Sequence, residues 1–301
     1  MIEILYLNMA DYDQFTKCLI TGNKDLFPLK GYEKDYLVKS KSSGFVFCSR
    51  IATEKELIEY YSSYPIGYNS DSEITRIRIN ELLDGFEKFK KTNKILDVGC
   101  GPGLFLIEAK KRGWEVYGTE FTIDQTNYLN EKGIKTSLGK LTSTSFGKES
   151  FDIIISSEVI EHINNPVEEM ELFHSFLRKG GLTYITTPNF NAIERYLLKE
   201  NYNVIEYPEH LSYYTPKTIH LLLINSGFKK LKVKTTGISI ARIKNSKQGS
   251  ADMTNEGEKS NDEALRASLE SGYKKHIKSF INWVLTTFGI GNSMKVWYVK
   301  K

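Results

Sequence analysis

The chain has 301 residues, of which 40% are hydrophobic and 26% charged, a composition typical of a globular protein with a sizeable core. Its formal net charge of +4 is spread over interspersed acids and bases, without the basic patch typical of nucleic-acid binders, so no nucleic-acid partner is expected. The sequence has three widely separated cysteines and no secretory segment at the start, which predicts a cytoplasmic protein with reduced thiols. It has no apolar stretch of roughly 20 residues, so no membrane span is expected.

Residues 1–52 are expected to form a small amino-terminal module of short strands. Phe27–Gly31 has the composition of a turn between segments. Tyr36–Val38 and Phe45–Phe47 have the composition of two short strands around a Ser-Ser-Gly turn.

A helical linker is predicted over residues 53–93, between this module and the rest of the chain. Thr53 and Glu56 have the spacing of a capping box, in which each side chain accepts a hydrogen bond from the other residue's backbone N–H. A second helix is expected from Ile74 to Lys90, because its apolar residues recur on one side.

Residues 94–301 alternate between apolar strand-like runs and helical segments, which predicts an α/β fold with a parallel sheet covered on both faces. A polar stretch at about 244–262 is expected to be an insertion, and an amphipathic helix follows over Glu263–Thr287. The last strand, Met294–Val299, can pair with the strand before the insertion as an antiparallel edge. The other predicted strands are Lys94–Val98, Glu115–Gly118, Ile134–Ser137, Phe151–Ser156, Gly181–Thr187 and Leu231–Thr236, and the other predicted helices are Leu104–Arg112, Thr122–Lys132, Pro166–Leu177 and Pro216–Ser226.

A glycine-rich turn, Asp97–Gly103, joins the first of these strands to the first helix. Its glycines let the backbone turn tightly and come close to a ligand that side chains would exclude. Their spacing is G-x-G-x-G, whereas a dinucleotide fingerprint needs G-x-G-x-x-G, and position 106 is Leu106. Glu120 ends the next strand, where a carboxylate can accept both ribose hydroxyls of a nucleoside.

The glycine-rich turn, Glu120 and the strand that begins Phe151-Asp152 together resemble class I S-adenosylmethionine (SAM)-dependent methyltransferases over residues 94 to about 240. The resemblance implies a Rossmann-like, seven-stranded, mostly parallel sheet with helices on both faces. It also implies that the turn surrounds the methionine part of SAM, that Glu120 holds the ribose and that Phe121 lies near the adenine. The cofactor-binding residues implied are Asp97, Gly99, Cys100, Gly101, Gly103, Glu120, Phe121, Leu141 and Ser156.

The amino-terminal module is similar to a zinc-ribbon-like module that often precedes the catalytic domain in bacterial methyltransferases of surface-polysaccharide and deoxysugar pathways. That module carries C-x-x-C twice, whereas here Cys18 is joined by Thr21, Ser40 and Ser43 at the other three positions. Because a structural zinc needs four N or S ligands, we expect a degenerate module without zinc. Substrate binding and simple packing both stay open as its role.

Glu158, Glu161 and His162 follow the strand Phe151–Ser156, and helical spacing would place them on one face. A second histidine, His210, is expected in a loop above the same crevice. Glu-x-x-Glu-His with a distant His resembles the metal site of small-RNA 2′-O-methyltransferases, and ubiquinone-pathway O-methyltransferases share its first part. The resemblance implies that Glu158, Glu161, His162 and His210 hold a divalent ion such as Mg²⁺ or Mn²⁺, and such mixed ligands also suit Fe²⁺.

Two other interpretations of the same residues stay open. His162 or His210 can act without a metal, as a general base or as a cap on the cofactor pocket, while Glu161 braces a loop. All of them can also be purely structural. Asn189, after the strand Gly181–Thr187, is a further candidate for a polar contact with the acceptor.

The function predicted from these resemblances is SAM-dependent O-methylation of a saccharide hydroxyl, in a nucleotide sugar or glycan precursor of polysaccharide biosynthesis. Because the SAM sulfonium already carries an activated methyl group, such an enzyme has to position an alcohol and remove its proton, which a divalent ion assists. One alternative is methylation at carbon or nitrogen of a deoxysugar or another small metabolite. A SAM-binding regulator without turnover is the alternative from a different class of protein.

Overall fold

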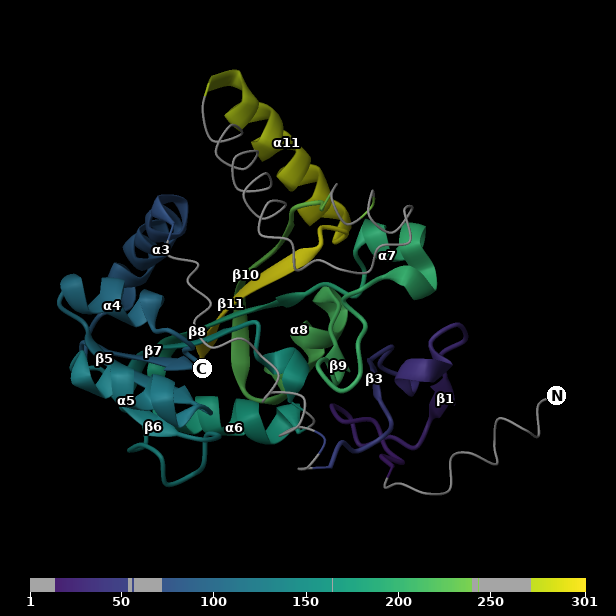
Figure 1. Cartoon of the computed structure of the whole chain (residues 1–301), viewed down its shortest axis with the longest axis horizontal. Helices are drawn as coiled ribbons and strands as arrows, with labels where there is room; N and C mark the ends of the chain where they lie inside the picture. The colour runs from purple at the N-terminus through teal and green to yellow at the C-terminus, as the bar shows by residue number, and fades with distance from the viewer. Residues whose placement is uncertain (1–13, 54–55, 57–71, 164, 240–242, 244–271) are drawn as a thin grey trace.

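The computed structural model describes residues 14–53, 56, 72–163, 165–239, 243 and 272–301, which Figure 1 draws in colour. The predicted polar insertion at about 244–262 lies outside the described residues, as does the linker between residues 57 and 71. No helix within the described ranges combines the length and the apolar character needed to cross a bilayer.

A seven-stranded sheet in the order β10-β11-β8-β7-β4-β5-β6 forms the larger layer of the molecule (Figure 1). The α/β prediction is therefore confirmed, with β4, β5, β6, β7 and β8 paired in parallel. From β4, the chain adds β5 and β6 on one side and then β7 and β8 on the other. This reversal of strand order opens a crevice at the carboxyl ends of β4 and β7. The strands are β4 (Lys94–Val98), β5 (Glu115–Glu120), β6 (Lys135–Leu138), β7 (Phe151–Ser157), β8 (Leu177–Pro188), β10 (Phe228–Thr236) and β11 (Ser293–Lys300).

The last strand, β11, pairs with β10 in antiparallel fashion as predicted, but its expected position at the edge of the sheet is wrong. It also pairs with β8, so β10 is the edge strand. Met294, Val296 and Tyr298, on one face of this inner strand, are all 0% exposed and belong to the core that covers that face.

Helices cover both faces of this sheet because its strands carry apolar residues on both sides. Leu96 and Ile154 belong to a core shared with α6 and α8, whereas Ile95, Ile153 and Ile155 belong to a core shared with α3 and α4. The α-helices are α3 (Glu73–Phe86), α4 (Leu104–Lys111), α5 (Ile123–Glu131), α6 (Pro166–Phe176), α7 (Ile193–Leu198), α8 (Pro216–Asn225) and α11 (Gly272–Phe288), and the short 3-10 helices are η1 (Glu33–Asp35), η2 (Glu87–Phe89), η3 (Ile160–His162) and η4 (Lys199–Asn201).

The predicted capping box between Thr53 and Glu56 is present. The Glu56 backbone N–H donates to Thr53 Oγ1 at 3.2 Å, and the Thr53 backbone N–H donates to Glu56 Oε2 at 2.9 Å. The helix predicted over Ile74–Lys90 is α3, which Ser72 caps by accepting a hydrogen bond from the Thr75 N–H, followed by the tighter turn η2.

A second, antiparallel sheet of four strands has the order β1-β2-β3-β9. Its first three strands, β1 (Leu26–Pro28), β2 (Leu37–Ser40) and β3 (Val46–Cys48), come from the amino-terminal region, but β9 (Ser212–Tyr213) lies far along the chain. The predicted turn at Phe27–Gly31 is partly wrong, because Phe27 and Pro28 belong to β1. Pro28 fits there because β1 is an edge strand and needs no second hydrogen-bonding partner.

The four positions compared with zinc thiolates lie around the β2–β3 turn. Cys18 Sγ lies 3.5 Å from Ser43 Oγ, and the Ser43 N–H donates to Ser40 Oγ at 3.3 Å. Ser40 Oγ in turn donates to Asp25 Oδ1 at 2.9 Å. Hydroxyl hydrogen bonds therefore hold this turn together, and the comparison with a zinc ribbon stays a prediction.

Candidate cofactor and acceptor site

The glycine-rich turn between β4 and α4 has three glycines with positive φ, +69° at Gly99, +50° at Gly101 and +70° at Gly103. A Cβ at Gly99 would lie 2.6 Å from Val159 Cγ2, and a Cβ at Gly103 would lie 2.3 Å from Leu129 Cδ2. A Cβ at Gly101 would meet no atom within 4 Å. Packing therefore requires the outer two glycines, whereas the middle one faces open space that a ligand can occupy.

Two carboxylates flank the turn. Glu120 Oε2 accepts a hydrogen bond from the Gly101 N–H at 2.9 Å, and Oε1 accepts from Thr122 Oγ1 at 2.7 Å, which fixes the carboxylate at the end of β5. Asp97 is 5% exposed, and its Oδ1 has no hydrogen-bond partner among the described residues. Burial, followed by the nearby charge of Glu120, raises the pKa of Asp97 to about 8. A buried acceptor without a donor fits a site completed by a ligand amine.

Apolar side chains border the far side of the turn. Phe121, which directly follows Glu120, is 70% exposed. Leu138 is 51% exposed and lies on β6, opposite Glu120 of β5 in the strand pairing. These two side chains are available to the flat face of a base, whereas the predicted contact Leu141 is buried in the core. Sequence reasoning missed Leu138 because it ended the strand one residue early, at Ser137.

The remaining two predicted cofactor contacts, Cys100 and Ser156, are both buried. Cys100 Sγ lies so close to Gly118 that a Cβ there would be 2.7 Å away, so this side chain packs into the sheet and only its backbone borders the turn. Ser156 lies beside Val98 at the end of β7. Their roles toward a cofactor stay predictions.

On the other side of the crevice, Glu161, His162 and His210 each offer one ligand atom within 4.8 Å of the others. We call these three residues the Glu–His group; among the described residues it is the only such cluster of possible metal ligands. The carboxyl of Glu161 is 2% exposed, and its Oε2 accepts a hydrogen bond from Thr187 Oγ1 at 2.9 Å. The two imidazole rings lie 4.9 Å apart between centroids.

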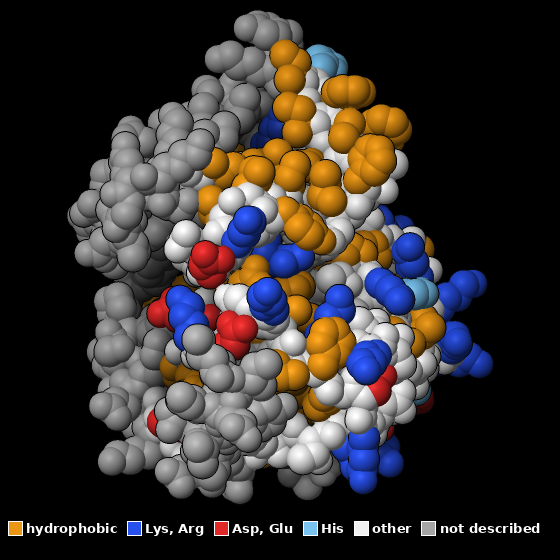
Figure 2. All heavy atoms as spheres, turned by 90° about the vertical axis from the view of Figure 1, so that its right-hand side faces the viewer, with side chains coloured by type: hydrophobic (Ala, Val, Ile, Leu, Met, Phe, Trp, Pro, Cys, Tyr) orange, Lys and Arg blue, Asp and Glu red, His pale blue; other side chains and the backbone are white. Residues whose placement is uncertain are grey.

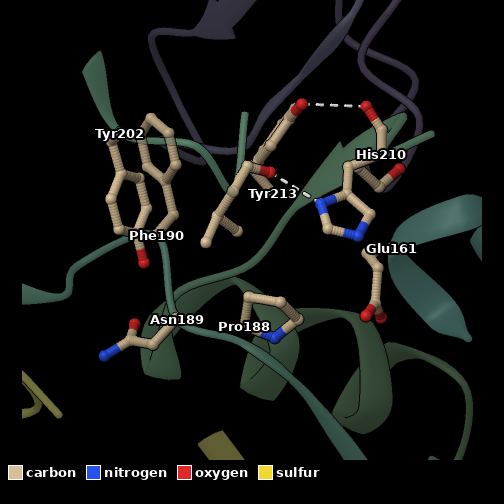
Figure 3. A pocket seen from close by; sticks show the side chains of 9 residues that line it. Glu161, Pro188, Asn189, Phe190, Tyr202, His210 and Tyr213 are labelled. Carbon is tan, nitrogen blue, oxygen red and sulfur yellow. Dashed lines mark hydrogen bonds between the residues drawn. The ribbon is translucent and has the colours of Figure 1, made fainter. Parts of the chain in front are cut away.

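Backbone carbonyls orient both imidazoles. His162 Nδ1 lies 2.5 Å from the Glu209 carbonyl oxygen, and His210 Nδ1 lies 2.6 Å from the Val204 carbonyl oxygen. Because a carbonyl oxygen can only accept, each Nδ1 is assigned the proton and each Nε2 keeps a lone pair. Metal-bound histidines commonly use the same outer contact. Figure 3 shows the His210 ring turned toward Glu161, with its other nitrogen in the hydrogen bond to the backbone.

Residues distant in the chain hold this group together. The Leu211 N–H donates to the Glu161 carbonyl at 2.8 Å, and Ser212 Oγ donates to the Ile163 carbonyl at 2.9 Å. The Cys48 N–H, in β3, donates to the Leu211 carbonyl at 2.9 Å. The amino-terminal sheet therefore fixes the segment that carries His210.

Burial controls the charge of the group. It raises the pKa of Glu161 well above its ordinary value, and the nearby Glu158 carboxylate raises it further. Burial also lowers the pKa of His162, as does the neighbouring His210. Burial therefore disfavours the charged forms of both side chains, and a cation at this position would favour the carboxylate of Glu161.

Glu158, predicted as a fourth ligand, is not one of the three residues that come within 4.8 Å of one another. It is exposed, and its φ is +53° because the chain bends there before η3 begins at Ile160. The helical spacing assumed from the sequence therefore does not apply to Glu158. Its N–H donates to the Thr186 carbonyl at 3.0 Å, which keeps it beside β8.

A small pocket lies beside the Glu–His group and has Glu161 and His210 in its wall (Figure 3). Pro188, Phe190, Tyr202 and Tyr213 give it an aromatic and apolar lining. Asn189, suggested from the sequence as an acceptor contact, also lines this pocket. Its side chain is 0% exposed, and its amide donates to the carbonyls of Gly289 at 2.9 Å and Gly291 at 2.7 Å, so a contact with the acceptor stays a prediction.

Comparison with known proteins adds sequence and fold relatives. Residues 72–233 match the methyltransferase domain family. The ubiquinone biosynthesis O-methyltransferase of Ruegeria pomeroyi is 28% identical over 104 residues, which are 33% of this chain and 42% of that protein. The mitochondrial enzyme of the same name from Rattus norvegicus is 30% identical over 137 residues, 42% of this chain and 38% of that protein. Both alignments span less than half of the relative.

The fold also has relatives among solved structures. The geranyl diphosphate C-methyltransferase from Streptomyces coelicolor A3(2), in complex with Mg²⁺, geranyl diphosphate and S-adenosyl-L-homocysteine, superimposes with a TM-score of 0.56. The match covers 83% of this chain and 99% of that one at 13% sequence identity. At this identity the likeness shows a shared fold.

Proposed function

This chain belongs to the methyltransferase domain family of class I SAM-dependent enzymes, and from that premise we propose that it methylates a hydroxyl of a saccharide with the help of a divalent cation. The acceptor would be a nucleotide sugar or glycan precursor. The observation that carries the proposal is the Glu–His group, whose three ligand atoms lie within 4.8 Å of one another beside the aromatic pocket.

The proposal assigns the cofactor to the glycine-rich turn. Gly101 leaves the space that SAM needs, and Glu120 is held at the end of β5, where its carboxylate can accept from the ribose hydroxyls. The buried Oδ1 of Asp97 is available to the ammonium of the methionine part. Phe121 and Leu138 would flank the adenine, since both are exposed at the ends of β5 and β6.

The proposed reaction is a single in-line displacement. The acceptor oxygen forms a bond to the methyl carbon as the bond from that carbon to sulfur breaks, leaving S-adenosylhomocysteine, and the hydroxyl proton passes to a neighbouring basic side chain or to water. A divalent cation, when bound, would make the hydroxyl more acidic and orient a neighbouring oxygen. Glu161 and the Nε2 atoms of His162 and His210 would hold it, and the Nδ1 contacts with backbone carbonyls would keep both imidazoles in position.

A sugar with neighbouring hydroxyls suits the proposal because it offers two oxygens to a cation held by the Glu–His group. The aromatic residues of the small pocket, Phe190, Tyr202 and Tyr213, are buried together in one core cluster, so they offer little open surface to an acceptor ring. The O-methyltransferase names of the curated relatives favour oxygen as the atom methylated, and they make a ubiquinone-pathway intermediate the second candidate acceptor.

Calorimetry separates the cation from the cofactor. SAM is titrated into metal-stripped protein, followed by Mn²⁺ or Mg²⁺, in the wild type and in Glu161→Ala and His210→Ala. We expect each substitution to abolish ion binding while SAM affinity stays within about twofold, because each removes one of only three ligands and leaves too few donors. Glu171→Ala and His276→Ala are matched controls, since both side chains are exposed outside the group.

SAM binding with no ion effect would contradict the metal assignment and would favour a metal-free base at His162 or His210. The acceptor class is tested separately, by measuring S-adenosylhomocysteine and a methylated product from a panel of nucleotide sugars and of ubiquinone-pathway intermediates. A product methylated at carbon or nitrogen would overturn O-methylation, and SAM binding without turnover of any acceptor would favour a regulator.

A further inference from the structure

The outward face of α11 carries large apolar side chains that the described protein leaves uncovered. Figure 2 shows them gathered along the upper part of that view, over α11. Positions 277, 280, 281, 284 and 288 have the i, i+3, i+4, i+7, i+11 spacing of one helical stripe. The exposed fractions are 51% for Ile277, 64% for Phe280, 44% for Ile281 and 69% for Phe288, and Val284 is half-buried. Trp283, 64% exposed, lies outside this spacing but stacks on Phe280.

A different side of α11 fastens it to the sheet. Leu285 is 4% exposed, and its carbonyl accepts a hydrogen bond from Thr235 Oγ1, in β10, at 2.7 Å. Thr286 Oγ1 donates to the Thr235 carbonyl at 2.9 Å. A surface helix normally presents polar residues to solvent, so an apolar outward face on a helix already fixed to its own sheet indicates a partner beyond the residues that the structure describes.

Charge indicates what kind of partner this is. Residues 272–288 include three lysines and one histidine but no acid, and the neighbouring strand β10 also has lysines and no acid. A second copy of this helix would bring like charges together, which opposes pairing, whereas an anionic surface would attract it. The lysines of α11 are Lys274, Lys275 and Lys278, and the exposed lysines of β10 are Lys229, Lys230, Lys232 and Lys234.

We propose that α11 docks the protein on an anionic membrane surface. The apolar stripe would lie at the boundary between head groups and acyl chains, and the exposed lysines of β10 would add electrostatic attraction to anionic head groups. Aromatic residues are favoured at this depth, and the rings of Phe280 and Trp283 stack on each other with centroids 5.9 Å apart. This is attachment along the surface of the bilayer, and it holds whichever acceptor the enzyme uses.

The docking helix is tied to the acceptor pocket. The loop after α11 accepts the amide hydrogen bonds of Asn189 through the carbonyls of Gly289 and Gly291. Asn189 and its neighbour Phe190 belong to the pocket wall. Docking through α11 would therefore hold the pocket close to the membrane, where an acceptor attached to a lipid is concentrated; this last step alone rests on the proposed function.

Vesicle binding of the full chain tests the proposal. The protein is sedimented with vesicles of phosphatidylcholine alone and of phosphatidylcholine mixed with phosphatidylglycerol, at low and high salt. We expect binding to the mixed vesicles only, weakened by salt because the attraction is partly electrostatic. The emission of Trp283 should shift to the blue on binding, since this side chain is 64% exposed whereas Trp114 is only 3% exposed.

The double variant Phe280→Ser/Trp283→Ser should lose vesicle affinity by at least about tenfold, because two large apolar side chains no longer enter the interface. Tyr128→Ser is the matched control, an exposed aromatic on α5 that should leave binding unchanged. Absence of binding to mixed vesicles, or equal binding of the double variant, would overturn the proposal. A wild-type dimer in light scattering that the double variant dissociates, with no vesicle binding, would assign the face to a second copy instead.

Discussion

The glycine-rich turn and the Glu–His group border the same crevice, but the chain builds them in different ways. The turn lies within seven consecutive residues, Asp97–Gly103, and its conformation follows from glycines at three positive φ values. The Glu–His group joins η3 to His210, and the contact between these segments depends on β9 and on its pairing with β3 of the amino-terminal sheet. Local sequence therefore builds the cofactor side, and long-range pairing builds the acceptor side.

This difference has a consequence for mutations. A substitution in the turn should change the binding of SAM or the stability of the fold, and should leave the acceptor chemistry intact. A substitution in the Glu–His group, or in the strands that hold it, should do the reverse. Each of the following predictions would break this separation if it failed.

Glu161→Gln has the largest expected effect. The amide keeps the shape of the side chain and its contact with Thr187 Oγ1, but it cannot become the carboxylate that holds a cation or accepts a proton. We expect the rate of methyl transfer to fall by about 10²- to 10⁴-fold, with SAM affinity within about twofold of wild type. The rate is measured as S-adenosylhomocysteine formed from the acceptor that the screen identifies. A SAM affinity that falls together with the rate would show that the two sides are coupled.

Gly103→Ala and Gly101→Ala form a matched pair on the cofactor side. At Gly103 a Cβ would lie 2.3 Å from Leu129, which is fully buried, and φ is +70°, so we expect the free energy of unfolding to fall by about 2–4 kcal/mol. At Gly101 the Cβ meets open space, so stability should fall by only about 1 kcal/mol while SAM affinity falls at least about tenfold. Denaturant unfolding and SAM calorimetry measure the two effects, and equal profiles for the two variants would contradict the assignment of the open space to a ligand.

Asp97 predicts a pH dependence of the SAM-free protein. Its pKa of about 8 in the folded state exceeds the ordinary value of 3.8, so between these values the folded state binds more protons than the unfolded chain. The free energy of unfolding contributed by this group therefore falls as pH rises, by about 2–3 kcal/mol between about pH 6 and pH 8. Unfolding of Asp97→Asn should lack this slope. SAM should also reduce it, because an ammonium beside Asp97 favours the carboxylate.

Ser212→Ala has the smallest expected effect and tests the long-range side. Ser212 Oγ donates to the Ile163 carbonyl at 2.9 Å and so links β9 to the end of η3. Its loss should lower the free energy of unfolding by about 1 kcal/mol. It should weaken Mn²⁺ binding severalfold with SAM affinity unchanged, because His210 is less firmly held against Glu161. Unchanged Mn²⁺ affinity would mean that β9 does not position the group.

The sequence by itself determined the parts that depend on neighbouring residues. The strand Lys94–Val98, the glycine-rich turn and Glu120 at the end of the next strand follow from local hydrophobicity and backbone freedom, and so does the α/β alternation. The same local patterns identified Glu161, His162 and His210 as candidates, because a carboxylate and imidazoles near a strand end suit metal or acid–base chemistry.

Only the tertiary structure decided which of these residues meet. It places β11 between β8 and β10, where alternate residues of β11 enter the core on one face of the sheet. It bends the chain at Glu158, where φ is +53°, and it uses Asn189 to hold the loop after α11. It also pairs β9 with β3, a contact between residues more than a hundred positions apart. Periodicity describes which side of an element is buried, whereas the partner across a sheet or crevice is selected by packing of the whole chain.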